Sequence, residues 1–502
     1  MSKNQYDVIV IGSGMGGLTA AVELASQGAR VLVLEQHYLL GGACTTYTRK
    51  GGYLFDAGVE SISGLGERGP VHHFLRKHNL WDRLVWLRNQ YEFQYQGKVF
   101  VIPTSWEAWR DQLIERYPHE GKGLKGFFMT CKKAYEQMYY SFAPDRVTPY
   151  EPQSLAEKLA YPIKHPQFFR WMKRTWGELL QNFVQDPGLH AQLSMLTGYV
   201  GDAGKDTPAA SMLALMGYFI DGGFRPQGGS GELAKQLVQK LREYGGEAKI
   251  HVDVKSILIE NNRIIGVESN RGRFEAPIVI SNVDPRVTYE QLIDPNHLPP
   301  QILANAQALQ PSMSLYIWSA ALTRPFVSDR LTFVHLDTPV ELPLNNLRVT
   351  SYTYQSASAV DSTLVPEGAG SVAINLRAKP LATHYRAMSE DQYQACKKEL
   401  DDFCRTLIAQ IDPDTASSIL FSEVSTPKTV QHFMRTYEGS IYSSKINKSI
   451  QFPNITTPIN GLFLTGAGVG YGPGIEAVVI TGAATAEQVL SYRGSELFAR
   501  QN

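Results

Sequence analysis

The chain has 502 residues, enough for about three domain-sized units or for one large two-domain enzyme. Its 48 basic and 48 acidic side chains balance, so no overall field attracts nucleic acid as a partner. Four scattered cysteines form no CxxC pair, which favours buried thiols in a reducing compartment. The most apolar window, residues 209–220, is shorter than the roughly 20 residues that span a bilayer, and we expect no signal peptide before the first strand. We therefore expect a cytoplasmic protein, either soluble or attached peripherally to a membrane.

The first part of the chain has the pattern of a dinucleotide-binding βαβ unit. A buried strand at 6–11 is followed by a glycine-rich loop, a helix at 18–27 and a second strand at 30–34. The loop consists of Gly12, Ser13, Gly14, Met15, Gly16 and Gly17. A glycine-rich turn that binds nothing is the alternative, but it does not explain why strand, helix, second strand and a terminal acid follow in register.

Individual residues of this unit suit a bound diphosphate. Gly12 allows the tight turn out of the strand, Gly14 lets the backbone approach a pyrophosphate, and Gly17 lets the helix pack close to the strand. The helix N-terminus offers unpaired amide groups and the positive end of its dipole to the phosphates. Glu35, roughly 20 residues further on, can accept hydrogen bonds from ribose hydroxyls, and we add its neighbour Gln36 to the cofactor site.

A second glycine cluster follows the βαβ unit. The pair Gly41-Gly42 suits a turn with close approach of a ligand, and a short strand bounded by glycines (GGYLFDAG) spans residues 51–58. The succession of Glu35, the glycine pair and this strand resembles the FAD-binding N-terminus of flavoproteins related to phytoene desaturases, carotene isomerases and retinol saturases. The resemblance implies FAD as the cofactor. It adds these cofactor-side candidates: Gly41, Gly42, Ala43, Asp56, Ala57 and Gly58.

Two later segments match the same family. The first contains, in order, the loop PQGGSGEL at 226–233, a helix, a strand at 247–252, a hairpin of 254–260 and 263–268, and a buried strand at 275–281. The resemblance implies that the chain after the helix approaches the adenine, with Val252, Asp253 and Val254 as candidates. An ordinary αβ unit is the alternative, and it explains the periodicity but not the glycine loop.

The second matching segment lies near the C-terminus, where a short strand runs into Gly466 and a helix at 475–490 follows Gly474. In a flavin enzyme this helix N-terminus would face the ring edge on which reduction places negative charge, so these glycines and Ile475 are cofactor-side candidates. Glu476, an acid in the first helical turn, departs from many desaturases. It is either a partner of the helix dipole or a catalytic, proton-handling group. The motif contains no Cys or His, so we expect non-covalent FAD.

The segments between these motifs are two insertions. Residues 72–224 are dense in aromatic side chains and mostly helical in pattern, whereas residues 290–455 alternate like a mixed sheet with helices. Helices are expected at 71–78, 106–116, 124–140, 155–160, 168–183, 189–197 and 392–411. Strands are expected at 91–95, 98–102, 312–321, 331–340, 347–354 and 371–377, with a loop at 355–362.

The expected fold class is α/β, with a Rossmann-like FAD-binding domain of the glutathione reductase or amine oxidase type and an inserted α+β substrate domain. The FAD-binding domain would comprise residues 1–71, 225–289 and 456–502. The substrate-binding and membrane-facing domain would comprise residues 72–224 and 290–455. No second GxGxxG unit occurs, so we expect no separate NAD(P)H domain.

Residues 161–174 (YPIKHPQFFRWMKR) interleave basic and aromatic side chains. Such a segment suits a membrane interface, because aromatic rings sit at headgroup level while cations meet anionic lipid. The alternative is a surface helix whose aromatic side chains face the core. Pro162 and Pro166 favour this alternative, because they interrupt a long interfacial helix.

The expected function is that of an oxidoreductase that uses FAD to act on a carotenoid or a related apolar polyene or isoprenoid lipid. The sequence does not distinguish between desaturation, saturation and cis–trans isomerisation, and it does not indicate the oligomeric state. HExxH and paired CxxC motifs are absent, so no metal is expected. Two rivals stay open: an amine-oxidase-like enzyme with an aromatic cage from Tyr437, Tyr442 and Tyr471, and a non-catalytic prenyl-binding protein of the GDP-dissociation-inhibitor type.

Overall fold

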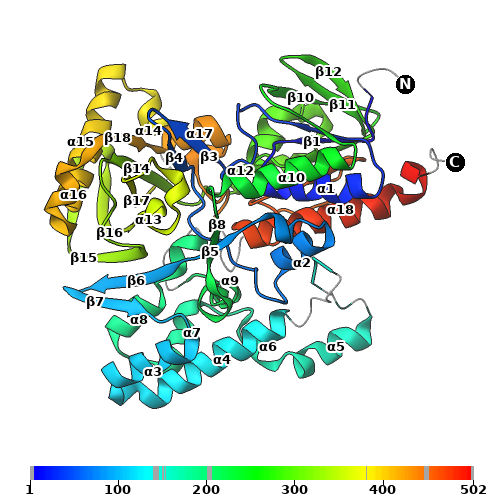
Figure 1. The fold of residues 1–502 in the computed structure, drawn as a ribbon. Coiled ribbons are helices and arrows are strands. Elements are labelled where there is room, and N and C mark those ends of the chain that lie inside the picture. The colour runs from blue at the N-terminus through cyan, green and yellow to red at the C-terminus, as the bar shows by residue number, and fades with distance from the viewer. Residues whose placement is uncertain are drawn as a thin grey trace.

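The computed structural model describes residues 5–139, 146–149, 152, 154–200, 206–379, 382–445 and 452–498. Its first sheet has five parallel strands in the order β19-β13-β1-β2-β9 (Figure 1). The strands are β1 (Val8–Ile11), β2 (Val31–Leu34), β9 (Glu247–Lys249), β13 (Ile278–Ser281) and β19 (Leu462–Leu464). Both ends of the chain and its centre therefore meet in one sheet. The extreme ends of the predicted FAD-binding domain, residues 1–4 and 499–502, lie outside the described residues.

Both faces of the five-stranded sheet are covered. The covering elements are α1 (Met15–Ser26), α10 (Gly231–Glu243), α18 (Ile475–Phe498), β10 (Val254–Glu260), β11 (Arg263–Ser269) and β12 (Gly272–Glu275). Val8 and Val10 pack against the three helices, while Ile9 and Ile11 pack against the antiparallel sheet β10-β11-β12. Successive side chains of a strand point to opposite faces, so coverage on both sides requires the uninterrupted apolar runs VIVI and VLVL.

A second sheet has seven strands in the order β18-β14-β17-β16-β15-β6-β7. The strands are β6 (Gln90–Tyr95), β7 (Lys98–Ile102), β14 (Ser314–Leu322), β15 (Arg330–Leu342), β16 (Leu347–Gln355), β17 (Gly370–Ala378) and β18 (Ile419–Ser425). β6 pairs with β15 in parallel, and the other neighbours are antiparallel. Because β6 and β7 come from the first insertion and the other strands from the second, the two insertions build one sheet.

One face of the seven-stranded sheet packs on the long helix α15 (Glu390–Ile411). Ile374 and Leu376 of β17 belong to the core cluster that contains the apolar side of this helix. Asn375 and Arg377 alternate with them along the strand, so they point to the opposite face, where they line a cavity. The sheet therefore separates a packed core from a ligand-accessible space.

A helical region lies below the seven-stranded sheet in Figure 1. Its helices are α3 (Trp106–Arg116), α4 (Gly121–Tyr139), α5 (Leu155–Lys164), α6 (Pro166–Trp171), α7 (Trp176–Phe183), α8 (Pro187–Leu193) and α9 (Ala209–Leu215). Trp109, Phe127, Trp171 and Trp176 are fully buried in one cluster between these helices. The high aromatic content of the first insertion thus forms a core of its own.

The remaining elements connect these layers. They are β3 (Thr46–Arg49), β4 (Tyr53–Asp56), β5 (Trp86–Arg88), β8 (Phe224–Pro226), α2 (Pro70–Lys77), α11 (Pro285–Val287), α12 (Pro300–Ala308), α13 (Ala357–Val360), α14 (Ala382–Arg386), α16 (Pro413–Ser417) and α17 (Pro427–Met434). β3 pairs with β4, and β5 pairs with β8, as short antiparallel ribbons. α13 lies in the segment 355–362, which the sequence predicts as a loop.

Three predicted elements are divided in the structure. The helix predicted at 189–197 is α8 followed by a 3₁₀ helix at Met195–Val200. The helix predicted at 168–183 is two helices, α6 and α7, because Thr175 caps the second one. Its side chain accepts a hydrogen bond from the amide of Glu178, whose carboxylate accepts one in return. The strand predicted at 275–281 is interrupted because Pro277 has no N–H to donate to a ladder, so β12 ends and β13 begins on either side of it.

In the part of the chain that the structure describes, no helix has both the length and the apolar character that crossing a bilayer requires. The same residues contain no group of three or more His, Cys, Asp or Glu side chains that could hold a metal ion. All four cysteines are buried and free, as the sequence predicted for the thiols.

Candidate functional site

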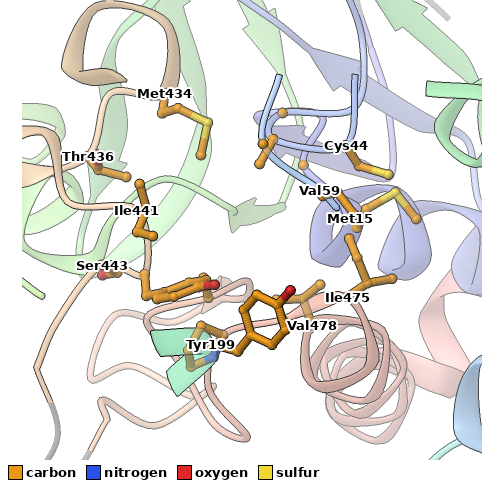
Figure 2. Close-up of a pocket in the computed structure, with 18 of the residues that line it drawn as sticks. Met15, Cys44, Val59, Tyr199, Met434, Thr436, Ile441, Ser443, Ile475 and Val478 are labelled. Atoms are coloured by element: carbon orange, nitrogen blue, oxygen red, sulfur yellow. The ribbon is translucent and has the colours of Figure 1, made fainter. Parts of the chain in front are cut away.

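A cavity of about 1720 Å³ is lined by residues of both large sheets and of the helical region. Figure 2 shows Met15, Cys44 and Ile475 on one side of this space, with Met434 and Ile441 across from them. Its volume exceeds the roughly 300–1,000 Å³ of most small-ligand sites. The cavity therefore has room for an extended cofactor together with a second ligand.

Most of the residues predicted for the cofactor line this one cavity. They are Gly12, Gly14, Met15, Gly16, Glu35, Gln36, Gly41, Gly42, Ala43, Ala57, Gly58, Val254, Gly466, Gly474, Ile475 and Glu476. Val252 and Asp253 line it as well. Ser13, Gly17 and Asp56 are not on its wall but make contacts behind it. The fold thus brings together residues that are more than four hundred positions apart in the sequence.

The N-terminal loop and the C-terminal motif meet backbone to backbone. A Cβ atom at Gly16 would lie 2.9 Å from the Cα atom of Gly466, so this approach requires glycine at position 16. Gly466 has φ of +98°, a conformation that other residues rarely adopt. The two glycines therefore let the first turn of α1 and the chain after β19 share one wall of the cavity.

Asn282 joins these segments, and the sequence analysis did not single it out as a site residue. Its Oδ1 atom accepts a hydrogen bond from the backbone amide of Gly17 at 3.0 Å. The backbone amide of Asn282 donates to the carbonyl oxygen of Ile11 at 2.9 Å. The side chain also lines the cavity. Asn282 directly follows β13 at the carboxyl edge of the parallel sheet, where ligands of such folds bind, and this position is the signal that could have identified it.

Glu35 anchors the glycine-rich loop at the end of β2. Its Oε2 atom accepts hydrogen bonds from the amide and the hydroxyl of Ser13, at 2.9 and 2.6 Å, and its Oε1 atom accepts one from the amide of His37 at 2.9 Å. The neighbouring Gln36 accepts a hydrogen bond from Nε of Arg435 at 2.5 Å. Ser13 therefore acts through Glu35, and residues after α17 close this end of the cavity.

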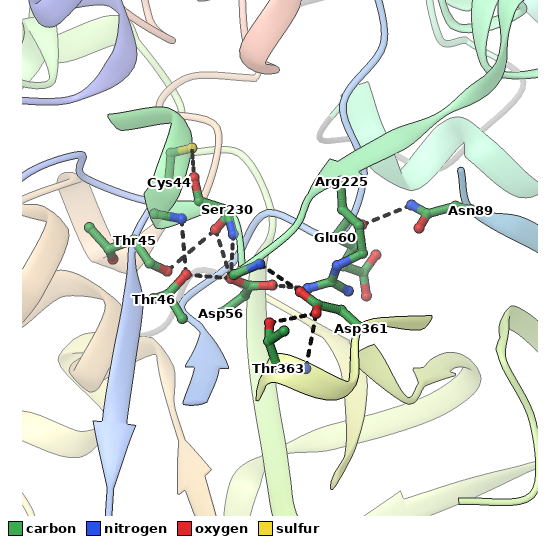
Figure 3. Close-up of polar contacts among 12 residues, drawn as sticks. Cys44, Thr45, Thr46, Asp56, Glu60, Asn89, Arg225, Ser230, Asp361 and Thr363 are labelled. Carbon is green, nitrogen blue, oxygen red and sulfur yellow. Dashed lines mark hydrogen bonds and ion pairs between the residues drawn. The ribbon is translucent and has the colours of Figure 1, made fainter. Parts of the chain in front are cut away.

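Asp56 lies in a polar junction behind the cavity wall (Figure 3). It accepts hydrogen bonds from the hydroxyl of Thr46 at 2.7 Å and from the amide and hydroxyl of Ser230 at 2.7 and 2.9 Å, and it pairs with Arg225. These contacts join β4, β8 and the start of α10. Asp56 therefore positions the loop before α10 and lies behind the cavity wall, whereas its neighbours Ala57 and Gly58 line the cavity.

Glu476 lies in the first turn of α18 and on the cavity wall. The hydroxyl of Ser63 donates a hydrogen bond to its Oε2 atom at 2.5 Å. Burial raises the pKa of Glu476 to about 7, and the Ser63 hydrogen bond opposes this rise only in part. The dipole of the helix would favour the ionised form, so burial outweighs it. A carboxyl group with this pKa can exchange a proton near neutral pH.

A second buried acid, Glu60, lies four residues beyond β4 and was not identified from the sequence. Its carboxylate accepts hydrogen bonds from the hydroxyl of Tyr199 at 3.0 Å, from the hydroxyl of Thr353 at 3.4 Å, and from the side-chain amide of Asn375. Burial raises the pKa of Glu60. Because its partners come from three distant segments, no local pattern marks this residue.

The three tyrosines proposed for an aromatic cage do not all line the cavity. Tyr442 and Tyr471 line the cavity. Tyr437 is not on its wall, and its ring lies 3.7 Å from the guanidinium carbon of Arg286. The structure thus brings two of the three candidate side chains to the site.

The basic and aromatic segment 161–174 divides between two environments. Trp171 is fully buried in the helical core, and Phe168 packs against that core. Phe169 is 45% exposed, although it also lines the cavity together with Met172. The segment therefore faces the core on one side and the cavity on the other.

Known proteins share this architecture. A family model described as flavin containing amine oxidoreductase matches residues 15–490. A chloroplastic prolycopene isomerase of Daucus carota is 28% identical over 521 residues, covering 98% of this chain and 81% of that protein. An all-trans-retinol 13,14-reductase of Danio rerio is 25% identical over 552 residues, covering 98% and 87%. The crystal structure of an oxidoreductase from Methanosarcina mazei has a TM-score of 0.64 at 18% identity, covering 96% of this chain and 100% of that one.

These matches confirm three expectations drawn from the sequence. The fold is the Rossmann-like, FAD-binding α/β fold, and the resemblance to carotene isomerases and retinol saturases holds along the chain. The chain is an enzyme with a flavin cofactor.

Replacing Asp56 by Ala should destabilise the protein, because Arg225, whose side chain is only 2% exposed, would be left as an unpaired buried cation. Breaking a buried pair in this way costs about 3–5 kcal/mol. The unfolding midpoint in urea measures the change. Arg49→Ala is the matched control, since its pair with Glu423 is 38% and 32% exposed and should contribute less than about 1 kcal/mol. Equal shifts in the two variants would contradict the role given to Asp56.

Proposed function

Because the chain belongs to the flavin-containing amine oxidoreductase family, we propose that it uses non-covalently bound FAD to convert the polyene chain of a carotenoid or a related isoprenoid lipid. The observation that carries the proposal is the single cavity that joins the dinucleotide fingerprint to a largely apolar wall on the substrate side. The named activities of the relatives, prolycopene isomerisation and retinol reduction, support a polyene substrate.

FAD would lie along the cavity wall at the edge of the five-stranded sheet, with one half at the N-terminal glycine loop and the other at the start of α18. The AMP and diphosphate half would be held by Gly12, Gly14, Met15, Gly16, Glu35 and Val254, where the first turn of α1 provides amide groups. Gly466 and the start of α18 would hold the flavin ring. When bound, FAD supplies hydride or electron transfer at N5. Absence of Cys and His from residues 466–476 supports non-covalent binding.

The substrate would occupy the remaining space between the seven-stranded sheet and the helical region. Phe333 and Ile317 come from the sheet, and Met195, Ala210 and Leu215 come from the helical region. These apolar side chains exclude water and suit a hydrocarbon chain. We therefore assign residues 72–224 and 290–455 to the substrate side and the three remaining segments to the FAD side.

Glu476 is our candidate for proton handling. The conversions open to a polyene differ in proton balance: saturation takes up a proton, desaturation releases one, and isomerisation does neither. The position of Glu476 at the start of α18, beside the proposed ring site, and its pKa near neutrality suit either direction of transfer.

Exposed apolar side chains of α5 support attachment to a membrane. Leu155, Leu159 and Ile163 follow one another at four-residue spacing along α5 and are 74%, 68% and 81% exposed. No residue of this helix is buried. Lys158 and Tyr161 of the same helix line the cavity, so the apolar stripe and the cavity share this helix. We therefore place the protein in the cytoplasm, attached peripherally to an anionic lipid surface from which the substrate would enter.

An amine substrate is the second candidate, because Tyr442 and Tyr471 line the cavity.

The purified protein should show flavin absorbance and release FAD on denaturation. Incubated without oxygen, it should change the absorption spectrum of a carotenoid or retinoid substrate. Oxygen-dependent release of peroxide with primary amines, without conversion of any polyene, would favour the amine function. A colourless protein that takes up no FAD would contradict both and favour the non-catalytic prenyl-binding alternative.

Replacing Glu476 by Gln should remove an inflection near pH 7 from the rate of polyene conversion, because the amide cannot exchange a proton. If the reaction requires protonated Glu476, its rate falls as the pH rises through 7. If the reaction requires the Glu476 carboxylate, its rate rises over the same range. Ser63→Ala is the companion variant: it removes the hydrogen bond that favours ionisation, so the inflection should move to higher pH. An unchanged inflection in Glu476→Gln would exclude this residue as the proton-handling group.

The double variant Leu159→Asp, Ile163→Asp should bind vesicles at least tenfold more weakly than the unaltered protein, because it places two charges in the apolar stripe of α5. Sedimentation with vesicles that contain a fifth of anionic lipid measures the binding. Leu420→Asp is the matched control, since Leu420 is 57% exposed on β18, outside the stripe. Equal binding by all three proteins would argue against this docking surface.

A further inference from the structure

Arg377 brings a positive charge to the cavity wall on the substrate side. It lies on β17 and points away from the core that packs on α15. Its guanidinium group lies flat on the backbone of Gly198, where a Cβ atom would come within 2.7 Å of Cζ. The space for the charged group therefore depends on the absence of a side chain at position 198.

The guanidinium group has few acceptors. Among the residues that the structure describes, its hydrogen-bond partner is the carbonyl oxygen of Met195 at 3.5 Å, and no carboxylate lies within ion-pair distance. A guanidinium carries five N–H donors. Burial lowers the pKa of Arg377, which reflects the cost of holding the charge away from water. Most of its donors are thus available to a ligand in the cavity.

Glu60 is close enough to interact electrostatically with Arg377, but it does not form an ion pair with it. Its oxygens are taken by Tyr199, Thr353 and Asn375, which are all neutral donors. Because burial raises the pKa of Glu60, its negative charge is also less complete than that of an exposed glutamate. Among the residues that the structure describes, the charge of Arg377 therefore lacks a direct counter-charge.

We propose that Arg377 binds a carboxylate at one end of an otherwise apolar polyene substrate. The guanidinium fork matches a carboxylate with two parallel hydrogen bonds. A hydrocarbon end or a neutral hydroxyl would leave the cation buried without compensation. Phe333 and Ile317 line the same cavity and can contact the apolar chain. This inference rests on the proposed function for the polyene part of the ligand, whereas the anchor itself can be tested by binding alone.

The test compares two probes that share one polyene and differ at its end, all-trans-retinoate and all-trans-retinol. Dissociation constants are measured on the FAD-loaded, full-length protein by quenching of its tryptophan fluorescence, which seven tryptophans provide. The unaltered protein should bind retinoate at least tenfold more tightly than retinol. Arg377→Gln should abolish this preference and leave the affinity for retinol within twofold.

Two further variants separate the anchor from general charge and folding effects. Lys397→Gln removes a cation from the wall of the same cavity and should keep the preference for retinoate. Gly198→Ala keeps the charge but displaces the guanidinium group, so it should weaken retinoate binding without affecting retinol. The thermal midpoint of ligand-free Arg377→Gln should equal or exceed that of the unaltered protein, because the variant removes an unpaired buried charge.

Each outcome bears on the anchor or on the reaction separately. Equal affinity for retinoate and retinol, or a preference that survives in Arg377→Gln, overturns the anchor even if the protein converts hydrocarbon polyenes. A preference that depends on Arg377, in a protein that converts no polyene, supports the anchor and contradicts the proposed reaction. A large loss of thermal stability in Arg377→Gln shows that the side chain serves the fold and also overturns the proposal.

Discussion

The site depends on the contact between Gly16 and Gly466. One of these residues begins the helix after the first strand, and the other follows the last strand of the same sheet. A single methyl group between them would force the two segments apart, and the cavity wall would then lose its continuity. Asn282 reinforces the contact from the strand between them by holding the amide of Gly17. A cavity that runs past both motifs therefore requires this close packing of backbone on backbone.

The residues just after β4 link the two functional parts of the cavity. Glu60 reaches the seven-stranded sheet through Thr353 and Asn375. Ser63, three residues later, reaches α18 through Glu476. A short segment therefore contacts both the proposed ring site and the substrate side. Because each contact involves a buried carboxyl group, a shift of this segment would alter the protonation of both acids.

Local patterns in the sequence were sufficient for the elements of the five-stranded sheet and for most of the cavity wall beside it. The glycine loop, Glu35 and the turn before α18 could be predicted because each one follows a strand within a few residues, and spacing alone places it at the sheet edge. The ion pair of Asp56 could not be predicted, because its partner Arg225 lies far along the chain. Arg377 could not be identified for the same kind of reason: its surroundings are Gly198 and Met195, which no periodicity connects with β17.

The pairing of strands also determines when the molecule can fold. In the seven-stranded sheet, β6 can pair with β15 only after the residues from Arg330 onward have been synthesised. In the five-stranded sheet, β1 lies two strands away from β19, which ends at Leu464. Loop closure over such separations is slow and exposes apolar strands until it is complete. Neither sheet can be completed during synthesis until nearly all of the chain has left the ribosome. A nascent chain with an unpaired β6 edge is therefore a natural client for a chaperone, and truncation before β19 would leave the five-stranded side of the cavity without its edge strand and without α18.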